Sequence, residues 1–152
     1  MASEGSQVVV VGVDGSPASA MALAWAVRYA KATGASIRAV RAWHYPAAAG
    51  PAPVGVAPAS VSAEVAEAQQ KELDQAVTAA LGNNPSVTVQ TKVAYGHPAE
   101  VLVDESADAD LLVVGNRGHG GFTGMLLGSV SMYVVHSAHC PVTVVRAGKS
   151  LA

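Results

Sequence analysis

The sequence predicts an α/β protein built on a sheet of parallel strands with helices on both faces. Two runs, residues 7–15 and 111–115, are aliphatic without polar alternation, which is typical of strands covered on both faces. Segments of helical character separate these runs from further strand-like segments. Strands that alternate with helices pair in parallel through right-handed crossovers. We therefore expect a doubly wound, Rossmann-like sheet of five strands in the order 3-2-1-4-5.

The first helix is predicted from signals at both of its ends. Ser16 suits the N-cap and Pro17 the first helical position, directly after the strand at 7–15. No helix-breaking residue follows until Gly34, which suits the position just past a helix end. The run at 35–43 is then expected to form the second strand.

Residues 43–60 are rich in proline, alanine and glycine, and we predict a mobile loop there. A helix is expected over about 61–81, where apolar residues recur near helical spacing. The strand at 86–96 has only one apolar face, which places it at an edge of the sheet. The remaining elements are expected to be a short helix that opens at His97, the strand at 111–115, a helix at 129–138 and a last strand at 141–146.

Composition favours a single soluble domain over residues 1–152, with flexible tails at 1–6 and 148–152. Hydrophobic residues make up 51% of the chain and charged residues 13%, which argues against disorder. A net charge near −2 gives no field that would hold nucleic acid or an anionic membrane. The lone Cys140 excludes an internal disulfide and, with a short polar start to the chain, favours the cytoplasm.

The segment 115–131, GNRGHGGFTGMLLGSVS, carries six glycines between a buried strand and a helix start. Glycine lets the backbone take positive φ and approach a bulky anion closely. A helix N-terminus adds free N–H groups and the positive end of the macrodipole. Ser129 adds a hydroxyl donor, and Arg117 and His119 are the nearby cationic side chains. The pattern favours a ligand that bears phosphate over a surface loop that binds nothing.

Two well-known phosphate-binding patterns are absent from this segment. It has no lysine, which excludes the P-loop pattern GxxxxGK[ST]. It is not GxGxxG either, and it follows the fourth strand rather than the first. In a doubly wound sheet, ligands bind beyond the carboxyl ends of the strands where the strand order reverses, which here means near Asp14 and Gly115.

The spacing Gly115-x2-Gly118-x9-Gly128-Ser129 resembles the nucleotide-binding signature of the universal stress protein family, in its ATP-binding branch. The likeness extends over nearly the whole chain, through VVVVGVDGSPAS, DADLLVVGNRGHGG and LLGSVSMYVVHSAHCPVTVVR. Gly12 stands where some nucleotide-binding relatives have proline, and we regard that change as harmless.

The resemblance implies adenine and ribose contacts at one end of a site and phosphate contacts at the other. It implies ATP as ligand, Mg²⁺ on the phosphates, and a homodimer through the last strand, Val142 to Arg146. Adenine and ribose are expected at Asp14, the backbone of Ala42, Val114 and Gly115, and the phosphates at Gly118, Gly128, Ser129, Val130 and Ser131. The full expected site adds Gly12, Val13, Arg117 and His119.

Several side chains have two possible roles. Asp14 suits a turn, because Asp bonds nearby backbone N–H groups, but its carboxylate can also accept from adenine or ribose, which we favour. His119 is equally compatible with a γ-phosphate contact and a solvated loop. Trp43 is expected to pack rather than to touch a ligand.

Two clusters of polar residues are expected to lack a functional role. His136, His139 and Cys140 lack a fourth metal ligand, so we interpret them as structural or exposed. The carboxylates of Asp104, Glu105, Asp108 and Asp110 precede the fourth strand, at the sheet end opposite the expected ligand, and are interpreted as a solvated face.

The predicted function is a regulatory ATP-binding module of the stress response that is not an efficient enzyme. No GxSxG elbow or HExxH motif occurs, and no nucleophile is paired with a base. Such a module would report its nucleotide state through the order of the 43–60 loop or through the dimer. Three alternatives stay open: a cAMP-binding protein on the same fold, a slow ATPase or adenylyl transferase, and a scaffold whose dimer surface matters more than any ligand.

Overall fold

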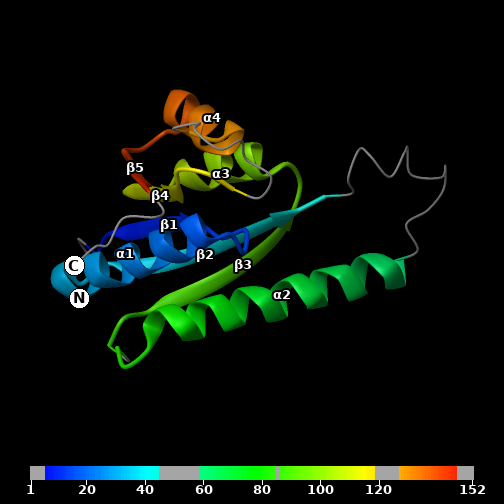
Figure 1. The fold of residues 1–152 in the computed structure, drawn as a ribbon, viewed down its shortest axis with the longest axis horizontal. Helices are drawn as coiled ribbons and strands as arrows, with labels where there is room; N and C mark the ends of the chain where they lie inside the picture. Colours follow the sequence, from blue (N-terminus) through cyan, green and yellow to red (C-terminus); the bar gives the residue numbers. More distant parts are fainter. Residues whose placement is uncertain (1–5, 45–58, 85, 119–126, 147–152) are drawn as a thin grey trace.

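The computed structural model describes residues 6–44, 59–84, 86–118 and 127–146, and strands alternate with helices throughout these ranges (Figure 1). The elements are β1 (Val8–Gly12), α1 (Pro17–Thr33), β2 (Ser36–Trp43), α2 (Ala59–Leu81), β3 (Val89–Tyr95), α3 (Pro98–Ser106), β4 (Leu111–Gly115), α4 (Ser129–Ser137) and β5 (Val142–Val145). The five strands form one parallel sheet in the order β3-β2-β1-β4-β5. The predicted fold class and strand order are confirmed.

Several element boundaries differ from the sequence-based expectations. β1 stops at Gly12 rather than residue 15, because the chain turns away at Asp14. Trp43 completes β2 and α2 already begins at Ala59, so the expected loop at 43–60 is shorter at both ends. Its interior, 45–58, lies outside the described residues, as do the expected tails apart from residue 6.

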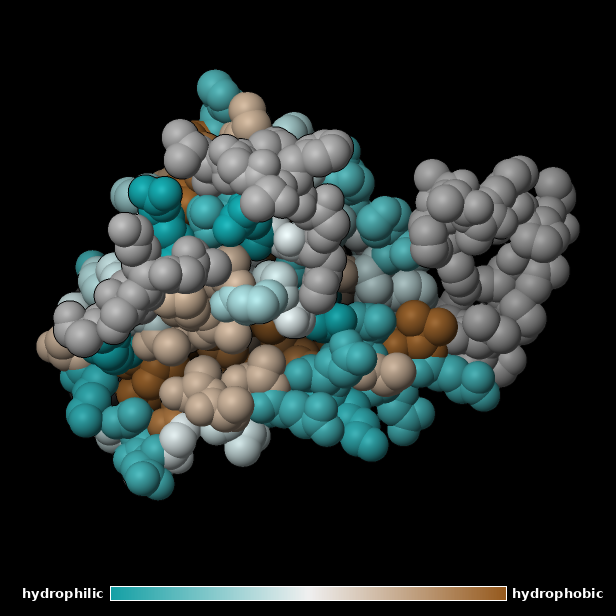
Figure 2. Space-filling view, viewed as in Figure 1, coloured by the Kyte–Doolittle hydropathy of each residue, from teal (hydrophilic) through white to brown (hydrophobic). Residues whose placement is uncertain are grey.

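Two apolar layers sandwich the sheet. Val9, Val11 and Ile37 face α1 and α2, in a cluster that includes the fully buried Leu73. The alternate strand residues, with Val10 as an example, face α3 and α4. This alternation on strands buried on both faces explains why β1 and β4 have no polar residues. Figure 2 shows that the outer side of α2 is mainly hydrophilic, as expected for a helix with one packed face.

The predicted ends of α1 are confirmed. The Ser16 side chain accepts a hydrogen bond from the N–H of Ser19 (3.2 Å), and Pro17 occupies the first turn. Gly34 ends the helix at φ 80°, a left-handed conformation that favours glycine. None of the helices in the described ranges is long and apolar enough to cross a membrane.

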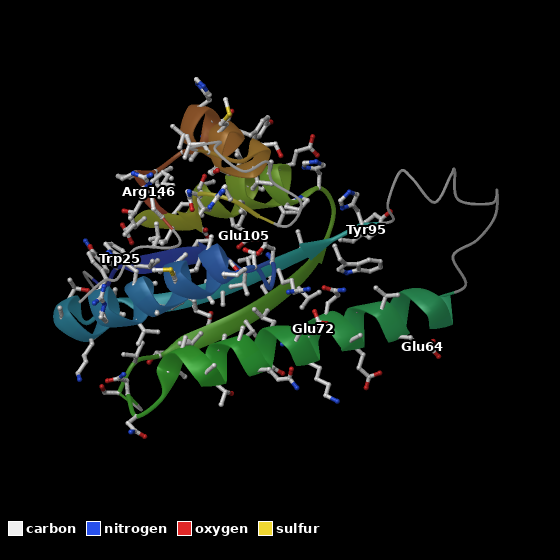
Figure 3. The ribbon with its side chains drawn as sticks, viewed as in Figure 1. Trp25, Glu64, Glu72, Tyr95, Glu105 and Arg146 are labelled. Atoms are coloured by element: carbon white, nitrogen blue, oxygen red, sulfur yellow. The ribbon has the colours of Figure 1, made fainter. Side chains whose placement is uncertain are left out.

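The acidic cluster is only partly the solvated face expected. Asp104 is exposed, and Asp110 accepts a hydrogen bond from the N–H of Val8 (2.8 Å). Glu105 is different: its side chain is only 11% exposed and pairs with Arg38 (3.0 Å) and with Lys92 (Figure 3). The sequence hid this network because its cations come from β2 and β3, far away along the chain.

Arg38 also pairs with Asp108 at 3.0 Å. Their hydrogen bond raises the pKa of Arg38 and lowers the pKa of Asp108. Together with Glu105, this pair fastens the end of α3 to β2.

Ser106 joins two segments on the α3–α4 side. It is fully buried, and its hydroxyl donates to the carbonyl of Val103 (2.6 Å) while accepting from the N–H of His139 (2.9 Å). The end of α3 is thereby tied to the connection between α4 and β5.

We predict that Ser106→Ala lowers the free energy of unfolding by about 1–2 kcal/mol, because the His139 N–H loses its acceptor and the hydroxyl leaves a small void. Urea denaturation followed by circular dichroism measures the change. Thr78→Ala is the matched control, since the Thr78 hydroxyl bonds the Asp74 carbonyl on an exposed helix face. It is expected to change stability by less than about 0.5 kcal/mol. Equal losses in both variants would contradict a bridging role for Ser106.

Gly115, at the end of β4, lies against the backbone of α1. A Cβ atom built on Gly115 would stand 2.7 Å from the carbonyl carbon of Ala18, closer than real contacts allow. At Gly128 the nearest atom would be the Cα of Arg117 at 3.5 Å, which is ordinary contact. Glycine at position 115 is therefore required by helix packing.

Gly115→Ala is predicted to cost about 1–3 kcal/mol of stability, because α1 must move to admit the methyl group. Gly128→Ala should cost less than about 1 kcal/mol, since its φ of −77° suits any residue. Thermal unfolding of the two variants beside the wild type measures both. A Gly115→Ala protein as stable as Gly128→Ala would refute the packing explanation.

Candidate functional site

A cavity of about 540 Å³ opens where the carboxyl ends of β1 and β4 diverge. This volume lies within the range of small-molecule sites, roughly 300–1,000 Å³. Of the thirteen residues expected from the sequence, His119 lies outside the described residues and the other twelve line the cavity. These are Gly12, Val13, Asp14, Ala42, Val114, Gly115, Arg117, Gly118, Gly128, Ser129, Val130 and Ser131.

The N-terminus of α4 opens into this cavity without a side-chain cap. Gly128 is the N-cap, and the first helical hydrogen bond runs from the N–H of Met132 to the carbonyl of Gly128 (3.0 Å). The preceding N–H groups, those of Ser129, Val130 and Ser131, have no acceptor within their own helix. Three N–H donors at the positive end of a helix form a site that suits an anion.

The other two helices that begin at the cavity are capped. The Ser16 side chain caps α1, and the imidazole Nδ1 of His97 accepts from the N–H of Ala99 (3.3 Å) at the start of α3. Among the described helix starts at the cavity, only α4 therefore lacks a side-chain acceptor for its first N–H groups.

Asn116 joins the two described ends of the glycine-rich segment 115–131, called the glycine segment below. Its carbonyl accepts from the N–H of Gly128 (2.6 Å) and from the hydroxyl of Ser131 (3.0 Å). The Ser131 hydroxyl also lies 3.1 Å from the carbonyl of Gly128, so it is occupied by backbone acceptors. Any anion contact of Ser131 consequently falls to its N–H. Asn116 was not among the residues expected at the site, although its place directly after a strand-ending glycine was a signal.

Asp14 forms the turn expected from the sequence, and its carboxylate also lies at the cavity. Its Oδ1 accepts from the N–H of Ser16 (2.8 Å), which forms the turn between β1 and α1. Its carboxylate also lines the cavity, and a Cβ on Gly118 would stand 2.6 Å from Oδ2. A side chain at position 118 would therefore push the Asp14 carboxylate out of its present place. Neither Gly118 nor Gly115 has the positive φ that the sequence analysis associated with this segment.

Ala42 offers backbone groups at the β2 side of the cavity. Along β2 the backbone groups alternate in direction: the carbonyl of Val40 accepts from Val13 on the β1 side, and that of Trp43 accepts from Gly96 on the β3 side. Ala42 shares the direction of Val40. Because β1 has ended at Gly12, the N–H and C=O of Ala42 have no strand partner on that side within the described residues.

The cavity also contains residues that the sequence analysis missed. They come mostly from β2 and from the two capped helix starts, which are distant in sequence from the glycine segment. They are Ser16, Ser19, Val40, His44, Pro98 and Leu102. The Ser-Pro and His-Pro pairs were visible helix starts, but nothing in the sequence showed that both converge on one cavity.

The remaining sequence-based interpretations concern metals and packing. No group of three potential metal ligands occurs within the described ranges. Burial raises the pKa of the Cys140 thiol, the opposite of what a metal-binding thiolate needs. Trp43 packs against Tyr95 in a T-shaped pair, with ring centroids 4.9 Å apart, and Figure 3 shows Tyr95 where β3 ends. This contact supports the packing role expected for Trp43.

Comparison with known proteins places these features in a family. Residues 5–146 match the model of the universal stress protein family. Universal stress protein Rv2005c of Mycobacterium tuberculosis is 40% identical over 138 residues, which is 91% of this chain and 45% of that protein. The chain thus spans less than half the length of this relative.

Two solved structures show the same architecture over nearly complete chains. Universal stress protein UspA from Lactobacillus plantarum superposes with a TM-score of 0.73 at 26% identity, covering 92% of this chain and 97% of that chain. A universal stress protein in complex with cAMP gives 0.63 at 29% identity, covering 93% and 97%. With the family match across 5–146, these likenesses show that the chain belongs to the universal stress protein family.

Proposed function

We propose that this protein is a regulatory module that binds an adenine nucleotide, with ATP as its ligand. One observation carries the proposal: the uncapped N-terminus of α4 opens into the same cavity as the Asp14 carboxylate and the free backbone edge of Ala42. Each part of a nucleotide finds a partner there. The helix start can bind the phosphates, the Asp14 carboxylate can accept from ribose hydroxyls, and the N–H and C=O of Ala42 can bond the adenine base.

The phosphates are assigned to the α4 end of the cavity. The N–H groups of Ser129, Val130 and Ser131 point out of the helix start, and each anion contact at such a position is worth about 0.3–1 kcal/mol. Arg117 lines the same end and adds a positive charge. Gly118 and Gly128 line this end as well and place no side chain in the cavity.

The base is assigned to the β2 end. The adjacent N–H and C=O of Ala42 match the Watson–Crick edge of adenine, whose N1 accepts and whose amino group donates. Val40 and Leu102 supply buried apolar walls. Asp14 lies between the two ends in the sheet order, where its carboxylate can accept from ribose hydroxyls.

Cyclic AMP is the second candidate ligand, because a relative with 29% identity over nearly the whole chain was solved in complex with cAMP. Its single phosphate would need only the α4 donors. ATP agrees with the signature spacing and would also use Arg117 and Gly118. Mg²⁺ would be held mainly by the phosphates of ATP, since Asp14 is the only carboxylate that lines the cavity within the described residues.

A regulatory role, in the cytoplasm and in a stress response, is proposed from the family and from the character of the site. The groups that line the cavity can bind and orient a nucleotide. Among the described residues of the lining, no nucleophile is paired with a base. The homodimer is proposed at β5, from Val142 to Arg146, because β5 is an edge strand whose outer side can extend the sheet.

Native mass spectrometry of the freshly purified protein tests ligand and assembly together. The expected species is a dimer that carries one ATP per chain, identified after denaturation by the mass of the released molecule. Released cAMP would select the second candidate. An empty protein that binds neither ATP nor cAMP on titration would refute nucleotide binding, and a monomer at micromolar concentration would refute the β5 dimer.

Asp14→Ala and Gly118→Val are each predicted to weaken ATP binding at least about tenfold, because one removes the ribose acceptor and the other displaces it. Asp14→Asn is the sharper variant, since its amide oxygen can keep the turn bond to Ser16 while the charge is lost. It should also lose about tenfold in affinity with unchanged thermal stability. Isothermal titration calorimetry measures all three. Wild-type affinity in a folded Asp14→Asn protein would refute the ribose assignment.

A further inference from the structure

His44 provides the only aromatic ring among the described residues that line the cavity. It follows directly after β2, and its side chain is exposed at the rim rather than buried. No motif marks it in the sequence. A planar, half-apolar ring at the base end of a nucleotide cavity is suited to contact the base.

The ring lies on the α3 side of the sheet. Side chains alternate along β2, and Val40 packs with Leu102 in the cluster beneath α3. The same two-residue alternation places the side chain of His44 on the α3 side of the sheet. An independent contact agrees: the His44 ring lies 5.4 Å from the ring of His97, the N-cap of α3, at an interplanar angle of 42°.

His97 limits the positions that His44 can take. Its Nδ1 accepts from the N–H of Ala99, which fixes the His97 ring on the first turn of α3. The next residue, Pro98, itself lines the cavity. His44 thus has the ring of His97 on one side and the cavity on the other.

The peptide edge of Ala42 sets the orientation of the base. Backbone N–H and C=O groups of a strand point within the plane of the sheet. An adenine bonded to Ala42 therefore continues that plane, with its two faces turned toward the two helix layers. The face on the α3 side meets the side chain that projects there from the end of β2, which is His44.

We propose that His44 is a specificity-determining residue that stacks its imidazole on the purine base of the bound nucleotide, supported by His97. This inference rests on the proposed function and assigns it a base-recognition residue. Stacking depends on the overlap of ring area, so His44 favours adenine over the smaller pyrimidines when sugar and phosphates are the same.

The test compares probes with and without a base on the same proteins. His44→Ala is expected to weaken ATP binding about 5- to 150-fold, the range for loss of one base–aromatic stack, and to reduce the preference for ATP over CTP. Binding of inorganic triphosphate, measured by calorimetric competition, should stay unchanged. His44→Phe keeps a ring and should restore ATP affinity to within about threefold. His136→Ala, an exposed histidine near the end of α4, is the matched control and should bind as the wild type does.

A spectroscopic readout in the wild-type protein is independent of any substitution. ATP should move the His44 ring-proton resonances upfield through the ring current of the base, whereas inorganic triphosphate should leave them in place. A merely structural histidine would not distinguish the two probes.

The outcomes separate this inference from the function on which it rests. A wild-type protein that binds no adenine nucleotide overturns both. Wild-type ATP affinity in His44→Ala overturns the stacking role alone. Equal losses of ATP and triphosphate binding in His44→Ala also overturn it, because the residue would then support the cavity as a whole rather than the base.

Discussion

The position of β1 between β2 and β4 is the constraint on which the rest of the molecule depends. β1 pairs in parallel with β2 through Val8–Gly12 and with β4 through Val9–Val11. Since the strand order reverses at β1, α1 and α4 leave toward opposite faces of the sheet. The carboxyl ends of β1 and β4 consequently open a crevice that neither helix layer fills, and the cavity lies in this crevice.

The three signature glycines differ in what surrounds them. Gly115 lets the backbone of α1 approach β4, and Gly118 leaves space for the carboxylate of Asp14. Gly128 has ordinary space around it, so the described atoms do not require glycine there. The described atoms therefore require glycine at position 115, whereas at position 118 only a side-chain carboxylate would have to move.

The helix ends show a similar division of roles. Ser16 and His97 satisfy the first N–H groups of α1 and α3, which makes those ends rigid walls of the cavity. The start of α4 is left open, and it is held in place from outside the helix by the carbonyl of Asn116. An anchored but uncapped helix start is preorganised, so an anion can bind without first ordering the donors.

The sequence by itself determined the alternation of strands and helices, hence the parallel fold, and both ends of α1. These features are local or periodic: caps, breakers and apolar runs act within a few residues. Tertiary structure alone decided the pairing of Glu105 with Arg38 and Lys92, the use of the Ser131 hydroxyl by backbone carbonyls, and the presence of His44 and Leu102 at the cavity. Those contacts join residues far apart in the chain, and they form only when parallel pairing brings the strand ends to one edge of the sheet.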